Sequence, residues 1–347
     1  MSNVKAWMTS AAPFFGAQPT VSDVARWQNN QNKYNDQLTM SVAPFIPQIS
    51  VTMEVQPETK YIDFEGEECG EVKLAGDVNL TKEQSDANIN LNIRRGLPQL
   101  KPHAPVNDPV VICAGGPSLK RYLPNVRKRQ AEGRKIVSVN GTHNFLIENG
   151  INPSIHIQLD GRPFMSRFVE NPIDGCAYFM ASHSDPCVFD ALEDKRAYIF
   201  HTDYHNSAET ILKDFYRGNF LVCLGGSTVT LRAIWLLHLL GRTRQEIFGF
   251  DSCFLGDRHH AYSQAENDTD RRIPIIPDLM GEGRKKFWCA PWMVSQANEF
   301  QKMVASVGDQ FQLAVYGPGL IAHMLRTGAR VEWPQELGNS MIPPDKS

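Results

Sequence analysis

Short apolar runs alternate with longer amphipathic stretches along most of the chain, starting at Pro109. A short, continuous apolar run bounded by glycine, proline or a charged residue is typical of a strand buried in a parallel sheet. This pattern predicts strands at residues 110–114, 135–139, 155–159, 177–181, 197–200, 220–224, 246–250 and 312–316. Between them it predicts helices at residues 142–148, 186–192, 228–240 and 291–307, and one more that starts near Ser118.

Strands that alternate with helices build βαβ units, in which each crossover is right-handed. The chain is therefore predicted to fold as an α/β protein with a doubly wound, mainly parallel sheet that carries helices on both faces. Sheets of this kind bind ligands at the carboxyl ends of their strands. The residues that directly follow each strand are the first candidates for a functional site.

The first hundred residues have a different pattern. Glutamine and asparagine fill residues 28–32, glutamates crowd residues 65–71, and residues 49–55 alternate like a strand. A helix is predicted at residues 86–95, where Gly96 and Pro98 end it, and a proline-rich linker follows. We expect a small N-terminal appendage at residues 1–100, an α/β domain at residues 101–335 and a flexible C-terminal tail at residues 336–347.

Composition narrows the class of protein. The 347 residues include 35 Lys and Arg against 38 Asp and Glu, for a net charge of −3, and 42% are hydrophobic. These values exclude a wholly disordered chain and argue against general nucleic-acid binding. No apolar run approaches the roughly 18 residues of a membrane span, and residues 1–15 do not resemble a signal peptide. Seven cysteines without a Cys-x-x-Cys pair favour a reducing cytoplasm.

Two glycine-rich turns follow predicted strands and open predicted helices. The first contains Gly115, Gly116, Pro117 and Ser118, and the second contains Gly225, Gly226, Ser227 and Thr228. Glycine lets a ligand approach the backbone, and a helix start presents free N–H groups to an anion. Neither turn has the spacing of a P-loop or of a dinucleotide-binding motif. They predict two anionic subsites, as for a nucleotide diphosphate, with ordinary tight turns as the alternative.

Polar side chains follow three other strands. Asp160 and Asp251 each come directly after an apolar run, and Asn140 and Gly141 follow the strand at 135–139. A carboxylate at this edge can hold Mg²⁺, accept a ribose hydroxyl or act as a base, or it can simply cap the next helix. The Asn140 amide can bond a base or a ribose, or only shape its turn.

Histidines and basic residues supply further candidates. His183, His201 and His260 could each serve as a base, and residues 257–260 are expected to form a solvated loop with one functional histidine. A weak Asp-x-Asp pattern occurs at residues 268–270. Five basic residues have two interpretations: they form a flap over phosphates, or they belong to a solvated charged loop. They are Arg271, Arg272, Arg284, Lys285 and Lys286.

Three ordered segments resemble the signatures of a known family. They are residues 111–119 around the first glycine turn, residues 149–160 ending at Asp160, and residues 225–252 from the second turn past Asp251. The family is DUF115, also called 6-hydroxymethylpterin diphosphokinase MptE-like. It includes an archaeal pterin diphosphokinase and the central domain of flagellin glycosyltransferases (motility accessory factors). The first turn is also similar to one in bacterial sialyltransferases that use CMP-sugars.

The resemblance spans roughly residues 110–254 and implies a Rossmann-like fold with a nucleotide at the turn from Gly115 to Ser118. By position, it carries over Asp160 and the turn from Gly225 to Thr228 as site candidates. The expected activity is that of a nucleotide-dependent transferase. Its partners would be a nucleotide and an unidentified small acceptor, without nucleic acid or membrane.

The favoured reaction is pyrophosphoryl transfer from ATP, with Mg²⁺, to a small hydroxymethyl-bearing acceptor. In it the first turn would bind phosphate, Asp160 and Asp251 would serve as metal ligands or catalytic groups, and Arg162 would neutralise charge. The alternative is a glycosyltransferase that uses a CMP- or UDP-sugar, with His260 or another histidine as base. A third possibility is a non-catalytic interaction module on the same fold.

Overall fold

The computed structural model describes residues 61–62, 68–69, 80–202, 206–223, 225–264, 266, 270–277, 285–307 and 312–327. The strand expected at residues 49–55 and the tail expected at residues 336–347 lie outside these ranges. Two short strands, β1 (Tyr61–Ile62) and β2 (Glu68–Cys69), pair in antiparallel fashion. None of the described helices has the length and apolar character needed to cross a membrane.

Eight parallel strands form the central sheet, in the order β12-β9-β3-β4-β5-β6-β7-β8. The predicted doubly wound parallel sheet, with its Rossmann-like α/β architecture, is confirmed. The strands are β3 (Val110–Cys113), β4 (Lys135–Val139), β5 (Ile155–Gln158), β6 (Ala177–Ala181), β7 (Arg196–Thr202), β8 (Val222–Cys223), β9 (Arg244–Phe248) and β12 (Gln312–Tyr316).

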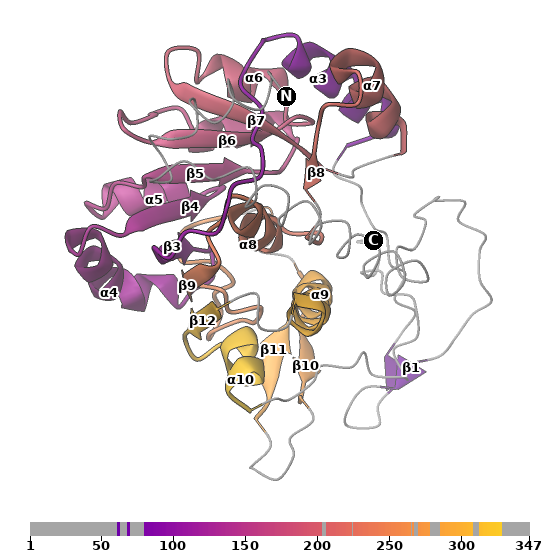
Figure 1. Ribbon diagram of the computed structural model, residues 1–347. Helices are drawn as coiled ribbons and strands as arrows, with labels where there is room; N and C mark the ends of the chain where they lie inside the picture. The colour runs from indigo at the N-terminus through magenta and orange to yellow at the C-terminus, as the bar shows by residue number, and fades with distance from the viewer. Residues whose placement is uncertain are drawn as a thin grey trace.

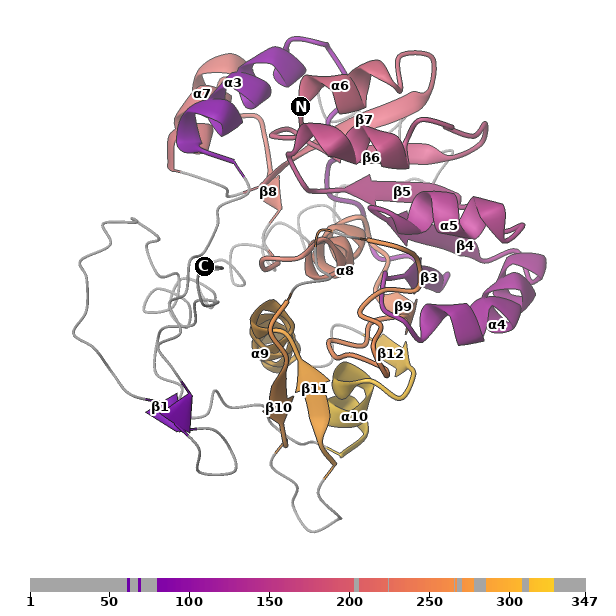
Figure 2. The same ribbon diagram turned by 180° about the vertical axis from the view of Figure 1, so that it is seen from behind.

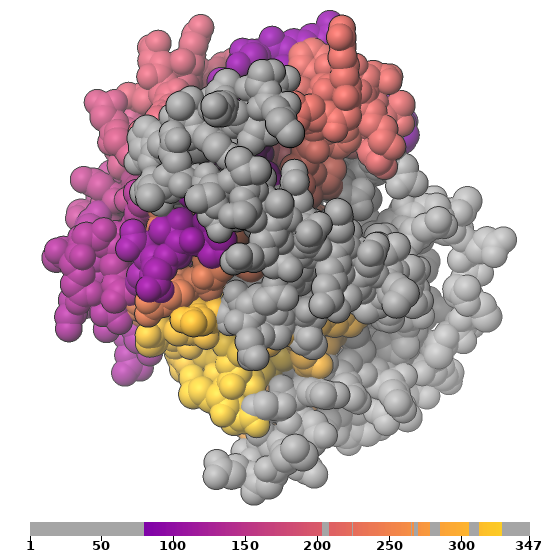
Figure 3. Space-filling view, in the orientation of Figure 1, coloured from indigo at the N-terminus to yellow at the C-terminus, as the bar shows by residue number. Residues whose placement is uncertain are grey.

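The strand order reverses at β3. The chain runs from β3 outward to β8, then crosses back and adds β9 and β12 on the other side of β3. Helices α3 (Lys82–Ile93) and α7 (Asn206–Tyr216) lie near β8, and α10 (Leu320–Thr327) lies beside β12 at the opposite end of the sheet (Figure 1). In the space-filling view, indigo and salmon segments lie at the top and the yellow segment lies below (Figure 3). A crevice therefore opens at the carboxyl ends of β3 and β9, which is the usual place for a ligand in such a sheet.

Alternation along the strands supplies both faces with apolar side chains. Val110 and Ile112 point to the face covered by α8 (Val229–Leu239) and α9 (Pro291–Val307), whereas Val111 and Cys113 point to the other face. Helix α8 is buried on nearly all sides, as expected for a helix that is apolar all round. Figure 1 shows α8 between the sheet and α9.

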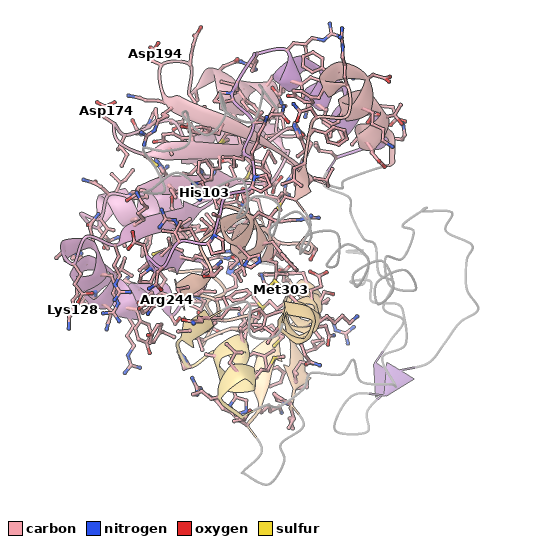
Figure 4. All side chains as sticks on the ribbon, viewed as in Figure 1. His103, Lys128, Asp174, Asp194, Arg244 and Met303 are labelled. Atoms are coloured by element: carbon pink, nitrogen blue, oxygen red, sulfur yellow. The ribbon has the colours of Figure 1, made fainter. Side chains whose placement is uncertain are left out.

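The opposite face carries α4, α5 and α6, which Figure 2 shows in front of the sheet, and α3 and α7 join its core, whereas α10 packs with α8 and α9. On α4 the apolar side chains of Leu123 and Val126 are buried, and Lys128 points outward (Figure 4). The helices of this face and of the sheet ends are α3 (Lys82–Ile93), α4 (Leu119–Ala131), α5 (Thr142–Glu148), α6 (Pro186–Asp190), α7 (Asn206–Tyr216) and α10 (Leu320–Thr327).

Several elements have no counterpart in the sequence-based prediction. They are the 3₁₀ helix η1 (Pro163–Phe168), helices α7 and α10, and a hairpin of β10 (Ile273–Ile275) with β11 (Phe287–Cys289). The hairpin strands and η1 are too short to show a period in sequence.

Helix α3 starts at Lys82 rather than at residue 86, because Thr81 and Gln84 form a capping box. It packs against α7, and its buried asparagines hold the loop after β6. Asn92 donates through its side-chain amide to the carbonyl oxygens of Ser182 and Ser184, over 3.0 and 2.7 Å. Helix α3, which falls within residues 1–100, thus contacts α7 and the loop after β6.

These contacts predict a large loss of stability in Asn92→Ala. The substitution leaves two buried carbonyl oxygens without a donor, so we expect the free energy of unfolding to fall by about 2–4 kcal/mol. Asn90→Ala is the matched control, since Asn90 bonds only to Asp86 within the same helix; its effect should stay below about 1 kcal/mol. Urea denaturation measures both values, and equal losses would contradict this account of the helix anchor.

Candidate functional site

A cavity of about 120 Å³ lies at the carboxyl ends of β3, β4, β5 and β9, where the strand order reverses. Side chains from α8 and α9 complete its wall. The structure brings together eight of the predicted site residues in this lining, namely Gly115, Gly116, Asn140, Asp160, Arg162, Thr228, Asp251 and His260. Six others do not line it, namely Pro117, Ser118, Gly141, Gly225, Gly226 and Ser227.

The first glycine turn is fastened to the end of β9. The backbone N–H of Gly116 donates to the Gly249 carbonyl over 2.7 Å, and the N–H of Ser118 donates to Asp251 Oδ2 over 2.8 Å. A Cβ on Gly116 would lie 2.5 Å from Asp251 Oδ2, so only glycine fits there. These two amides, expected to face a phosphate, are engaged by the protein itself.

Asp251 is a buried carboxylate at the centre of this arrangement, with 2% of its surface exposed. Burial raises its pKa to about 6, although the hydrogen bonds from Ser118 oppose the increase. Gly317 and Gly319 pack against the carboxylate, and its own carbonyl accepts the Leu320 amide at the start of α10. Asp251 therefore joins the β3 turn, β9 and α10 while it faces the cavity.

The segment from Leu255 to Gln264, here called the strap, covers the first turn. The N–H of Ala261 donates to the Gly115 carbonyl over 2.9 Å. The Tyr262 ring lies so close to Gly141 that a Cβ there would be 2.6 Å from it. The strap fills the space next to both glycines, and Gly141 is hidden from the cavity behind Tyr262.

His260 lies in the strap with its ring 6.4 Å from that of Trp292 and nearly parallel to it. Burial, together with the neighbouring His259, lowers the pKa of His260 to about 3, so its imidazole is neutral at pH 7. His259 is buried and stacks on Phe254. The expectation of a solvated loop is therefore wrong for the two histidines, whereas it holds for the exposed Asp257.

The other two histidine candidates lie elsewhere. His183 Nδ1 pairs with Thr202 Oγ1 over 3.1 Å, and His201 Nε2 pairs with Gln99 Oε1 over 3.3 Å. Neither ring lines the cavity. Of the three histidines considered as bases, the structure brings only His260 to the site.

Asp160 and Arg162 form a two-pronged ion pair on the cavity wall. Arg162 Nε lies 3.0 Å from Asp160 Oδ1, and Arg162 Nη2 lies 2.5 Å from Oδ2. The guanidinium also covers the Phe164 ring, 4.6 Å from its centroid. Asn140 stands beside the pair at φ 42°, a left-handed conformation, and its side-chain oxygen accepts the Leu159 amide. The pair fixes a carboxylate and a cation side by side.

The second glycine turn binds a carboxylate of the protein. Ser227 donates its backbone N–H and its hydroxyl to Glu299 Oε2, over 2.8 and 2.9 Å. Trp235 packs over Gly225. Of this turn only Thr228 reaches the cavity, where its hydroxyl accepts from Gln296 over 2.6 Å. The two turns thus contribute unequally to one site.

The basic residues for which a flap is one interpretation form their contacts away from the cavity. Arg272 bonds Asp257 over 2.9 Å and covers the Phe254 ring, and Lys285 donates to the Pro318 carbonyl. Arg284, Asp268 and Thr269 lie outside the described residues. None of the described flap residues lines the cavity.

Sequence reasoning did not assign α9 to the site, although α9 supplies Trp292, Met293 and Gln296 to the cavity wall. Gln296 accepts the Ser252 hydroxyl over 2.5 Å while it donates to Thr228, so it links β9 to the start of α8. Trp292 and Gln296 are one helical turn apart, so they lie on the same face of a helix. This spacing was the signal in the sequence that both side chains could reach one site.

The raised pKa of Asp251 predicts a pH-dependent stability. An unfolded aspartate titrates near about 3.9, so between roughly pH 4 and 6 the folded state binds more protons and the free energy of unfolding falls as pH rises. Asp251→Asn keeps a side-chain oxygen that can accept the Ser118 amide, but the asparagine side chain does not titrate. We expect the stability of the wild type relative to the variant to fall by about 2–3 kcal/mol from pH 4 to pH 7 in urea denaturation. A pH-independent difference would refute the burial of this charge.

Comparison with known proteins identifies relatives of the fold. The sequence profile of the 6-hydroxymethylpterin diphosphokinase MptE-like family matches residues 83–257. A solved structure of the MAf glycosyltransferase from Magnetospirillum magneticum AMB-1 superposes with a TM-score of 0.52 at 16% sequence identity. That alignment covers 75% of this chain and 40% of the other, so the chain spans less than half the length of that protein.

A comparison with curated protein sequences finds no match. At 16% identity the structural likeness establishes a shared fold. The profile match covers just over half of the chain and contains both glycine turns, Asp160 and Asp251. The chain belongs to the 6-hydroxymethylpterin diphosphokinase MptE-like family.

Proposed function

We propose that the chain is a nucleotide-dependent transferase that moves a pyrophosphoryl group from ATP to the hydroxyl of a small hydroxymethyl-bearing acceptor. The observation that carries the proposal is the convergence of Asp160, Arg162, Asp251 and His260 on one cavity at the point where the strand order reverses. The family description supports it, since a diphosphokinase is a transferase of this kind.

The cavity supplies the parts that such a transfer needs. Gly115 and Gly116 form part of its wall, and Arg162 offers a guanidinium fork that matches phosphate oxygens. Neutral His260 can accept the proton of the attacking hydroxyl. Asp160 holds Arg162 in place until a phosphate competes for the same guanidinium.

A Mg²⁺ ion fits the site only as a companion of the donor phosphates. Within the described ranges, no three His, Cys, Asp or Glu side chains gather as a metal site. Mg²⁺ commonly takes one or two carboxylates together with phosphate oxygens and waters, and Asp160 and Asp251 are the carboxylates on this cavity wall. When bound, the ion would neutralise phosphate charge.

One observation favours a second candidate, transfer of a sugar from a CMP-sugar. Arg162 is the one Lys or Arg among the described residues that line the cavity. A single cation suits the one phosphate of CMP better than the three phosphates of ATP. The structural neighbour is named a glycosyltransferase, which supports glycosyl transfer as the second candidate.

A nucleotide panel tests the proposed function. We expect ATP with Mg²⁺ to bind in calorimetry and to be consumed with release of AMP. Binding of CMP alone would replace the proposal with glycosyl transfer. If no nucleotide binds at all, the chain is a non-catalytic interaction module on this fold.

The proposal also predicts a role for Arg162. Arg162→Ala removes charge-assisted hydrogen bonds to phosphate, so we expect the affinity for ATP with Mg²⁺ to fall by about 10- to 100-fold. Arg127→Ala is the matched control, since Arg127 is an exposed arginine on α4 that bonds the Asn149 carbonyl away from the cavity. Calorimetry on both variants measures the change, and equal affinities for the two would remove Arg162 from the donor site.

A further inference from the structure

Two polar atoms of the strap converge on one point above Gly115. Tyr262 Oη lies 2.9 Å, and His260 Nε2 lies 3.4 Å, from the position that a Cβ on Gly115 would occupy. Gly115 does not have the positive φ that favours glycine, so its backbone would accept another residue. The strap therefore packs directly on Gly115, since His260 Cδ2 also lies 2.9 Å from that position, and the two polar atoms lie on the same side of the glycine.

Neither polar group is satisfied by the protein. Within the described chain, no hydrogen bond engages the Tyr262 hydroxyl or the His260 ring, and His260 Nδ1 is buried without a partner. Buried polar groups are normally hydrogen-bonded, and exceptions call for a functional explanation. Both residues line the cavity, whose volume of about 120 Å³ exceeds what a water-sized group requires.

We infer that Tyr262 and His260, whose ring centroids lie 5.5 Å apart, together bind the acceptor's hydroxyl group on the side that faces the cavity, an inference that rests on the proposed transferase function. A hydroxyl accepts one hydrogen bond and donates another. The phenol of Tyr262 donates to its oxygen, and the imidazole of His260 accepts its proton. An anionic phosphate would instead require a cation at this point, and neither residue provides one.

The protonation states suit this pairing. Burial raises the pKa of Tyr262 above its usual range, so the phenol keeps its proton at neutral pH. Burial lowers the pKa of His260 to about 3, so the ring has a free lone pair. The two groups are one donor and one acceptor, which is the complement of an alcohol.

Packing fixes both side chains in position. The Tyr262 ring lies against Gly141 and against Phe145, with ring centroids 5.8 Å apart. The backbone between Tyr262 and His260 is held by the Ala261 hydrogen bond to Gly115. Beyond the strap, Glu266 forms an ion pair of 2.8 Å with Arg167. The acceptor subsite is thus built from residues beyond the family match, which ends at residue 257.

The transfer step balances with these residues. The acceptor oxygen forms a bond to the β-phosphorus of ATP, and the bond from that phosphorus to the oxygen of the α-phosphate breaks. The electron pair leaves on AMP, and the hydroxyl proton passes to His260 Nε2. Tyr262 keeps its own proton and orients the acceptor oxygen.

Donor turnover with water as the acceptor tests the inference first. In Tyr262→Phe we expect release of AMP from ATP with Mg²⁺ to slow at least tenfold while the Kd for ATP stays within twofold. Tyr122→Phe is the control, since Tyr122 packs against Phe248 outside the cavity, and it should match the wild type. Weaker ATP binding in Tyr262→Phe, or unchanged turnover, would overturn the inference. Failure of the wild type to bind any nucleotide would instead overturn the proposed function.

Crystals soaked in ethylene glycol give a test that needs no activity. We expect a glycol or water oxygen within hydrogen-bond distance of both Tyr262 Oη and His260 Nε2 in the wild type and its loss in Tyr262→Phe. The same oxygen in both proteins would mark an adventitious additive only, and an empty position in the wild type would equally refute the hydroxyl site.

Discussion

The buried carboxylate of Asp251 holds the site together. It follows the end of β9, accepts the Ser118 amide from the turn after β3, and packs against the glycines that lead into α10. Because β3 and β9 flank the reversal of strand order, this single group fixes the two walls of the crevice relative to each other. A charge buried to this extent is costly, and its raised pKa records that cost. The other cavity residues are positioned around this anchored carboxylate.

The cavity wall has two origins in the chain. The strand ends and the ion pair of Asp160 with Arg162 lie inside the family match, whereas the strap from residue 258 onward and α9 follow it. In the proposed reaction, the first wall would meet the activated donor and the second would meet the acceptor. Tyr262, His260 and Trp292 all belong to the second wall.

Carboxylates of the protein bind at both glycine turns. Asp251 takes the amide of the first turn, and Glu299 takes the amide and hydroxyl of the second. Backbone N–H groups at a helix start attract any anion, whether it comes from a ligand or from a distant part of the same chain. A glycine turn in a sequence therefore predicts that an anion binds there, but it does not distinguish a ligand from a carboxylate of the same chain.

The sequence by itself determined the sheet and the edge that carries the site. The strand at 135–139, the helices at 142–148 and 291–307 and the strand at 312–316 occur where the apolar pattern placed them, because local alternation and turn residues decide them. Tertiary structure alone decided which candidates meet. It brought His260 rather than His183 or His201 to the cavity, placed Tyr262 over Gly115, and turned Glu299 toward Ser227. Those contacts join segments far apart in the chain, and no local pattern encodes the packing that sets them.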